Sequence, residues 1–259
     1  EAWQKLPYSA FARQFIAAQR FWDEAVKVHG VSERHQGLLA FLARQALDMA
    51  APSNNIITNP DILARSIESH GLNLFNGWLN ALDDMTAQAF GRAPPQEERL
   101  RVGIDVATMD GVVVARTAIA EIIHYKPRTP SVHTIPVVIV PAWIMKYYIL
   151  DLSPSNSLIR HLLDTGFSVF IVSWKNPDAD DRNIGFDDYR VQGVMSAIDA
   201  ACAITGANHI HLTGYCLGGT LAAIAAAAMG RDGDHRLKSL SLFASQTDFH
   251  EAGELRLFI

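Results

Sequence analysis

The feature that most constrains this chain is the alternation of strand-like and helix-like segments over its second half. Four short segments are apolar throughout, and segments of helical periodicity separate them. The expected strands are 136–140, 167–174, 209–213 and 237–244, and the expected helices are 153–166, 187–205 and 217–229. Apolar strands that alternate with helices are typical of a parallel sheet covered on both faces. The sequence therefore predicts an α/β fold for this part of the chain.

Residues 102–114, which precede these strands, have a different pattern. Val102, Ile104 and Val106 alternate with other residues, and residues 112–114 follow a turn at Asp110 and Gly111. A period of two on both sides of an Asp-Gly pair is typical of a β-hairpin. We expect an antiparallel pair of strands here.

The first part of the chain has helical periodicity. Apolar residues recur at steps of three and four in three segments, which include Phe11, Phe15, Trp22 and Val26; Leu38, Leu42 and Met49; and Leu74, Trp78, Leu82 and Met85. Another helix is expected to begin at Asn59, because Asn is a good N-cap and Pro60 suits the first helical turn. We expect the apolar faces that carry Phe11, Phe15, Trp22, Leu74 and Trp78 to pack internally.

A segment rich in glycine and proline at 91–95 cannot continue a helix and marks the expected domain boundary. The sequence thus predicts a helical N-terminal domain over 1–95 and an α/β domain over 96–259. The apolar residues that end the chain suggest that this second domain is incomplete at its C-terminus.

Composition excludes several classes of protein. Hydrophobic residues make up 49% of the chain and the net charge is −5, which argues against disorder and against a nucleic-acid partner. We expect no transmembrane segment, because the apolar runs are much shorter than the roughly 20 residues that a membrane span needs. No signal peptide is recognisable, and two cysteines cannot form a disulfide framework, so we expect a cytoplasmic protein.

The sequence GYCLGGT at 214–220 has the spacing of a nucleophile elbow, with Cys216 at the position of the nucleophile. An elbow is a sharp turn between a strand and a helix, and its strained backbone leaves no room for side chains beside the nucleophile. Gly214, Gly218 and Gly219 meet that need. The helix N-terminus favours a thiolate at Cys216, whereas Cys202, in an alanine-rich helix, fits a small buried side chain.

Acyl transfer at an elbow also needs backbone N–H groups that bind the oxyanion. The residue after the nucleophile, Leu217, supplies one, and the loop after the strand at 136–140 supplies another. Ala142 and Trp143 are the candidates in this loop. The aromatic residues of the loop fit simple packing equally well.

Several longer motifs accompany the elbow. They are EAW at 1–3 with PY at 7–8, SN at 53–54 with TNP at 58–60, KYYILDLSP at 146–154, SWKNPD at 173–178 and GYCLGGT at 214–220. With these motifs the whole chain resembles bacterial poly(3-hydroxyalkanoate) synthases (poly-beta-hydroxybutyrate polymerases) of the single-subunit class I type. The resemblance implies an α/β-hydrolase fold, a nucleophile at Cys216, and a cytosolic enzyme that resides on the polymer granule.

The chain departs from this family in two ways. The family commonly has Pro-Trp-Ile-Asn-Lys where this chain has Ala142 and Met145, so the asparagine amide near the oxyanion loop is lost. The family's catalytic Asp and His fall beyond Ile259, so we expect the chain as given to be inactive as a synthase on its own. Asp248 and His250 are the stand-in candidates for these two residues.

The expected function is that of an acyltransferase that polymerises 3-hydroxyacyl-CoA, here 3-hydroxybutyryl-CoA, through a thioester on Cys216. A thioester on cysteine keeps the acyl group activated, which an ester on serine would not do. The alternatives are an esterase or polymer depolymerase of the same fold, and a non-catalytic granule-associated partner of a synthase. The expected partners are the acyl-CoA, the growing polyester, the granule surface and a second copy in a homodimer. We expect no metal and no cofactor.

Overall fold

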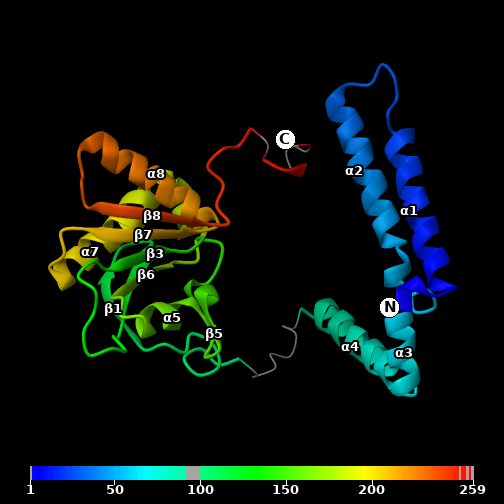
Figure 1. Ribbon diagram of the computed structural model, residues 1–259, viewed down its shortest axis with the longest axis horizontal. Coiled ribbons are helices and arrows are strands. Elements are labelled where there is room, and N and C mark those ends of the chain that lie inside the picture. Colours follow the sequence, from blue (N-terminus) through cyan, green and yellow to red (C-terminus); the bar gives the residue numbers. More distant parts are fainter. Residues whose placement is uncertain (1, 92–99, 251, 255–256, 258–259) are drawn as a thin grey trace. The chain divides into compact units, whose positions relative to one another are not determined.

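The computed structural model describes residues 2–91, 100–250, 252–254 and 257 (Figure 1). It divides the chain into two compact units, Glu1–Gln96 with His250–Ile259, and Glu97–Phe249. Most of the segment expected to form the domain boundary, 91–95, lies outside the described residues. The division into domains 1–95 and 96–259 therefore stays a prediction.

The first unit contains the helices that periodicity predicts. They are α1 (Tyr8–Ala25), α2 (Glu33–Met49), α3 (Pro60–Glu68) and α4 (Leu72–Ala89), with short 3₁₀ turns η1 (Ala2–Gln4) and η2 (Pro52–Asn54). Asn59 caps α3 as expected, because its side-chain oxygen accepts hydrogen bonds from the backbone N–H groups of Asp61 and Ile62. No helix among the described residues is long and apolar enough to cross a membrane.

The expectation that the apolar faces of these helices pack internally is wrong for three residues. Trp22, Leu74 and Trp78 expose 45%, 45% and 59% of their surface. The physical reason is that α1 packs with α2 and α3 packs with α4. A pair of helices buries only the stripe along which the two helices meet, so the rest of a wide apolar face stays exposed.

The second unit is built on a six-stranded sheet of order β1-β2-β6-β3-β7-β8. The strands are β1 (Gly111–Arg116), β2 (Ala120–Tyr125), β3 (Val137–Val140), β6 (Val169–Trp174), β7 (Ile210–Tyr215) and β8 (Leu237–Phe243). β3, β6, β7 and β8 run parallel, and β1 and β2 add an antiparallel edge next to β6. The four strands expected from apolar segments are thus confirmed.

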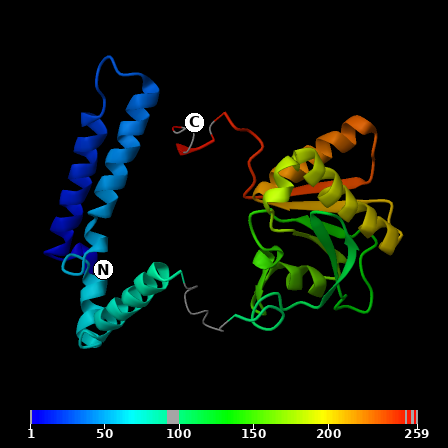
Figure 2. The same ribbon diagram turned by 180° about the vertical axis from the view of Figure 1, so that it is seen from behind.

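Helices cover both faces of this sheet (Figures 1 and 2). On one face lie α8 (Leu217–Asp232) and a long helix made of α6 (Phe186–Asp188), the π-helical segment η5 (Tyr189–Met195) and α7 (Ser196–Thr205). On the other face lies α5 (Leu158–Asp164). The fully buried side chains come from the strands and from the inner sides of these helices, as in Phe170, Ile139 and Leu221.

The predicted hairpin, in which residues 102–106 pair with 112–114 across a turn at Asp110 and Gly111, is wrong, although residues 112–114 do lie in a strand. β1 pairs with β2, not with residues 102–106, which form only an isolated bridge between Val102 and Val106. In that segment Gly103 has a positive φ of 85°, and the Asp105 carboxylate accepts a hydrogen bond from the Arg101 backbone N–H. Local turn chemistry therefore overrides the alternating pattern.

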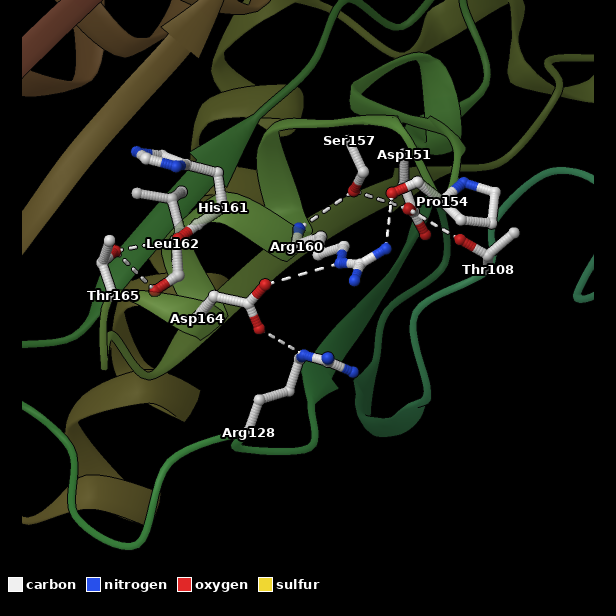
Figure 3. Close-up of polar contacts among 10 residues, drawn as sticks. All are labelled: Thr108, Arg128, Asp151, Pro154, Ser157, Arg160, His161, Leu162, Asp164 and Thr165. Atoms are coloured by element: carbon white, nitrogen blue, oxygen red, sulfur yellow. Dashed lines mark hydrogen bonds and ion pairs between the residues drawn. The ribbon is translucent and has the colours of Figure 1, made fainter.

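The helix expected from residue 153 also begins later. Ser153 ends β4 (Asp151–Ser153), which pairs with β5 (Asn156–Ser157), and Ser157 caps α5 by accepting a hydrogen bond from the Arg160 N–H at 2.9 Å. The Ser157 hydroxyl donates in turn to the carboxylate of Asp151 at 2.7 Å (Figure 3). This buried carboxylate selects Ser157 over Ser153 as the cap.

Asp151 is fully buried, and it ties this region to the segment that enters the sheet. Its carboxylate accepts from the Met109 N–H at 2.9 Å and from the Thr108 hydroxyl at 3.5 Å. On the exposed side of α5, Asp164 pairs with Arg128 and Arg160, as Figure 3 shows. Those two guanidinium groups, Arg128 foremost, lower the pKa of Asp164.

Candidate active site

The candidate site lies at the edge of the sheet where the parallel strands end. β3 ends at Val140, β6 at Trp174, β7 at Tyr215 and β8 at Phe243. The segments that follow parallel strands meet at one edge of a sheet, which is where α/β proteins bind their ligands. The candidate nucleophile and the candidate oxyanion loop both belong to this edge.

Cys216 occupies the sharp turn between β7 and α8. Its φ is 55° and its ψ is −127°, a conformation that residues other than glycine seldom adopt. Hydrogen bonds on both sides hold it: the Cys216 N–H donates to the Phe243 carbonyl, and the Gly219 N–H donates to the Cys216 carbonyl, each at 2.9 Å. This strained and firmly held backbone is typical of a nucleophile elbow.

The glycines around Cys216 are required by close approaches of the backbone. A Cβ on Gly214 would stand 2.3 Å from the Gly219 Cα, and a Cβ on Gly218 would stand 2.1 Å from the Val140 carbonyl oxygen. A Cβ on Gly219 would stand 1.7 Å from the Ser245 hydroxyl oxygen. The start of α8 therefore lies directly against the end of β3, where the candidate oxyanion loop begins.

The loop after β3 contains the expected oxyanion donors. Ala142 is fully buried, and its carbonyl accepts a hydrogen bond from the Met145 N–H at 3.1 Å, which closes a tight turn. The Trp143 ring packs against the rings of Phe186 and Tyr189, with 5.6 Å between centroids in both cases. Leu217 is the first residue of α8, so its N–H has no partner within the helix. Leu217 and Ala142 thus lie on either side of the contact between the end of β3 and the start of α8.

Two contacts that the sequence analysis missed hold this loop. The Trp174 indole N–H donates to the Pro141 carbonyl at 2.8 Å, and the Lys146 ammonium donates to the Asn176 side-chain oxygen at 3.0 Å. Both partners lie in the SWKNPD segment at 173–178, which comprises the last two residues of β6 and the four residues after it. In the sequence, the only sign of a role for this segment is that it is one of the motifs that carry the family resemblance.

The second cysteine, Cys202, has the packing role expected of it. It is half-buried on α7 and packs at the margin of the main core. Burial raises the pKa of the Cys202 thiol, although the nearby Arg236 guanidinium acts in the opposite direction. This thiol is therefore less disposed to form a thiolate than an ordinary cysteine.

The stand-in residues Asp248 and His250 follow β8 in irregular structure. The backbone carbonyl of Asp248 accepts a hydrogen bond from the Gln246 side chain, and His250 belongs to the unit that contains α1 to α4. Their role in a triad stays a prediction. The described residues contain no group of three or more His, Cys, Asp or Glu side chains that could hold a metal ion.

Comparison with known proteins identifies the family of this chain. A family model described as "Poly-beta-hydroxybutyrate polymerase (PhaC) N-terminus" matches residues 1–162, and a model described as "alpha/beta hydrolase fold" matches residues 135–259. The carboxylesterase EstE1, a solved structure, has 16% sequence identity and a TM-score of 0.40 and covers 54% of this chain and 47% of its own, which is too distant to bear on function.

Curated relatives match over nearly the whole chain. The poly(3-hydroxyalkanoate) polymerase of Methylorubrum extorquens is 36% identical over 99% of this chain and 43% of its own length. The corresponding polymerase subunit PhaC of Cupriavidus necator is 35% identical over 100% of this chain and 44% of its own. The chain spans less than half the length of these relatives. From the match over residues 1–162, the chain belongs to the poly-beta-hydroxybutyrate polymerase (PhaC) N-terminus family, and its second half has the α/β-hydrolase fold.

Proposed function

We propose that this chain carries the acyl-accepting site of a poly(3-hydroxyalkanoate) polymerase, with Cys216 as the nucleophile. The observation that carries the proposal is the left-handed backbone of Cys216, held between β7 and α8. A free cysteine that only fills space has no need of such strain. The names of the relatives supply the reaction class.

In the first step, the Cys216 thiolate attacks the carbonyl carbon of a 3-hydroxyacyl-CoA thioester. The new carbon–sulfur bond forms as the bond to CoA breaks, and CoA leaves with the proton that the Cys216 thiol gave up. The oxygen of the tetrahedral intermediate accepts hydrogen bonds from the Leu217 N–H and from N–H groups of the loop at Ala142 and Trp143.

In the second step, the 3-hydroxyl oxygen of another acyl unit attacks the Cys216 thioester. A carbon–oxygen bond forms, the carbon–sulfur bond breaks, and the hydroxyl proton passes to the Cys216 sulfur. Exchange of one thioester for another is nearly balanced in free energy, while formation of an oxygen ester is downhill, so the thiol preserves the activation of the acyl group until the chain grows.

The test is acylation of the 259-residue chain with labelled 3-hydroxybutyryl-CoA. We expect CoA release that is stoichiometric with the chain and a label on Cys216. The control is Cys202→Ala, which should be acylated normally, whereas Cys216→Ala should not be acylated. A label on Cys202, or no label on either cysteine, would contradict the proposal. Release of free 3-hydroxy acid with sustained turnover would instead indicate a hydrolase.

We also propose that the protein acts in the cytoplasm at the surface of polyester granules and forms a homodimer. Co-sedimentation with granules should persist in Cys216→Ala, because binding at the surface does not need the thiol. Analytical ultracentrifugation checks the second point, and a monomer at all concentrations would exclude the homodimer.

A further inference from the structure

We propose that Trp174 is a positioning residue of the acyl-transfer site, because its indole N–H sets the direction of the peptide group that joins Pro141 to Ala142. This inference rests on the proposed function at Cys216. It adds the group that keeps the second oxyanion donor oriented.

The carbonyl and the N–H of one peptide group have coupled directions. In a planar trans peptide, the carbonyl of one residue and the N–H of the next point in opposite directions. The Trp174 Nε1–H donates to the Pro141 carbonyl at 2.8 Å, so it fixes the direction of the Ala142 N–H as well. That N–H is one of the candidate oxyanion donors.

The Pro141 peptide also lies beside the elbow. A Cβ on Gly218 would stand 2.5 Å from the Pro141 carbonyl carbon and 2.6 Å from its oxygen. Rotation of this peptide would therefore alter the contact between the loop and the first turn of α8. The Trp174 hydrogen bond therefore acts on a peptide group that lies against the first turn of α8.

The indole is itself immobilised. The Trp174 backbone pairs with Ala120 in β2, and the Tyr189 ring packs on the indole with 5.1 Å between centroids. Gly193 of η5 lies against the ring, so that a Cβ there would stand only 2.0 Å from the Trp174 Cη2. Because η5 is π-helical, it departs from regular α-helical geometry beside this ring, and such segments are frequent at functional sites.

The exposed end of the loop has a tether of its own. The Lys146 ammonium donates to the Asn176 side chain at 3.0 Å, so the last residue of β6 and a residue just after it hold the two ends of the loop. Lys146 is exposed, and solvent competes for its hydrogen bond. The half-buried Trp174 bond is therefore the one that sets the peptide orientation.

The test compares two reactions of the same thiol. Acylation of Cys216 by p-nitrophenyl acetate passes through an oxyanion, whereas alkylation by iodoacetamide is a direct displacement without one. Two variants remove the indole N–H: Trp174→Phe, and replacement of Trp174 by 3-benzothienylalanine, which keeps the bicyclic shape with sulfur in place of the N–H. Trp78→Phe, in α4, is the control.

We expect both variants to slow acylation by about tenfold to a hundredfold, the effect of a misplaced oxyanion donor, with the alkylation rate unchanged. Equal acylation rates in wild type and the benzothienyl variant would overturn the proposal. Equal slowing of both reactions would also overturn it, since the indole would then hold the elbow as a whole.

A second measurement separates this inference from the proposed function. If the wild-type chain alkylates but does not acylate, the proposed function fails, and hydrogen exchange still tests the role of Trp174. Loss of the indole N–H should speed exchange at the amides of Ala142 and Trp143 and leave the amides of β7 unchanged. No change in the Ala142 and Trp143 amides would contradict the positioning role.

Discussion

Gly218, at the start of α8, lies so close to Val140, at the end of β3, that a Cβ on Gly218 would stand 2.1 Å from the Val140 carbonyl oxygen. Both sides of this contact are backbone, so neither can yield by rotating a side chain. The contact joins the elbow to the loop that carries the other candidate oxyanion donors.

Gly218→Ala should therefore force the two segments apart. We expect a loss of about 1–3 kcal/mol in the free energy of unfolding and a larger loss of acylation at Cys216. The control is Gly230→Ala, in the same helix, where a Cβ meets nothing within 4 Å. That variant should gain about 0.5–1 kcal/mol from helix propensity. Urea unfolding and acylation rates check both, and equal stability of the two variants would contradict the packing argument.

The two cysteines should differ in reactivity. Both are half-buried, but burial raises the pKa of Cys202, whereas Cys216 is the N-cap of α8, where the helix N-terminus favours negative charge. We expect iodoacetamide near neutral pH to modify Cys216 before Cys202 in the folded chain, and both at similar rates in urea. Peptide mapping by mass spectrometry over time measures this. Faster modification of Cys202 in the folded state would exclude Cys216 as the activated thiol.

Cys216→Ser keeps the shape of the elbow and changes its chemistry. The serine hydroxyl has a far higher pKa than a thiol, and its ester is less activated than a thioester, so acylation by 3-hydroxybutyryl-CoA should fall on the order of a hundredfold or more. Stopped-flow detection of CoA release gives the rate. A serine variant that acylates as fast as the wild type would show that the thiol is not essential.

His124 should make stability depend on pH. Burial lowers the pKa of this imidazole, which stacks on Phe170 at 4.2 Å and contacts the Ser168 hydroxyl at 3.0 Å. Below about pH 6.5 the unfolded chain takes up a proton that the folded chain resists, so the free energy of unfolding falls as pH falls toward the lowered pKa. Urea midpoints at pH 7.5 and 5.5 measure this fall. His124→Gln should reduce the difference, whereas His29→Gln, at an exposed position, should leave it unchanged.

Asp151 should be the most costly carboxylate of this region to remove. Asp151→Ala would leave the Met109 N–H and the Ser157 hydroxyl without their buried acceptor, and we expect a loss of about 2–4 kcal/mol in the free energy of unfolding. Asp164→Asn, which alters only exposed ion pairs with Arg128 and Arg160, should have a much smaller effect. Similar losses in the two variants would contradict the importance of burial.

Sequence periodicity was sufficient for most of the fold. The apolar segments at 136–140 and 209–213 indicated buried strands, and the glycines around Cys216 predicted the turn that follows β7. Strand β2 was missed because its pairing with β1 depends on the contact with β6, which no local pattern records. The start of α5 was misplaced because β4 and β5 form a short hairpin before it, in which the Ser157 hydroxyl donates to Asp151, and periodicity does not record such a contact.

The candidate site, too, could be predicted only in part from the sequence. Cys216, Leu217 and the loop at Ala142 follow from the elbow motif and from the order of the strands. The hydrogen bond from Trp174 to Pro141 joins residues 33 positions apart, and sequence periodicity does not reveal such long-range contacts. Trp22 and Trp78 show a second limit of the sequence pattern. An apolar stripe predicts a helix but does not identify the surface that covers the stripe, and both side chains are exposed.

The hydrogen bond from the Cys216 N–H to the Phe243 carbonyl has a consequence for the time course of folding. It makes the candidate nucleophile part of the pairing between β7 and β8, while Gly218 makes the same turn depend on β3. The elbow can thus be completed only after three segments distant in the sequence have met, and long-range contacts of this kind form slowly. In a refolding experiment, the native reactivity of Cys216 should therefore appear later than the helical circular dichroism signal. The time at which it appears reports when β3, β7 and β8 have come together.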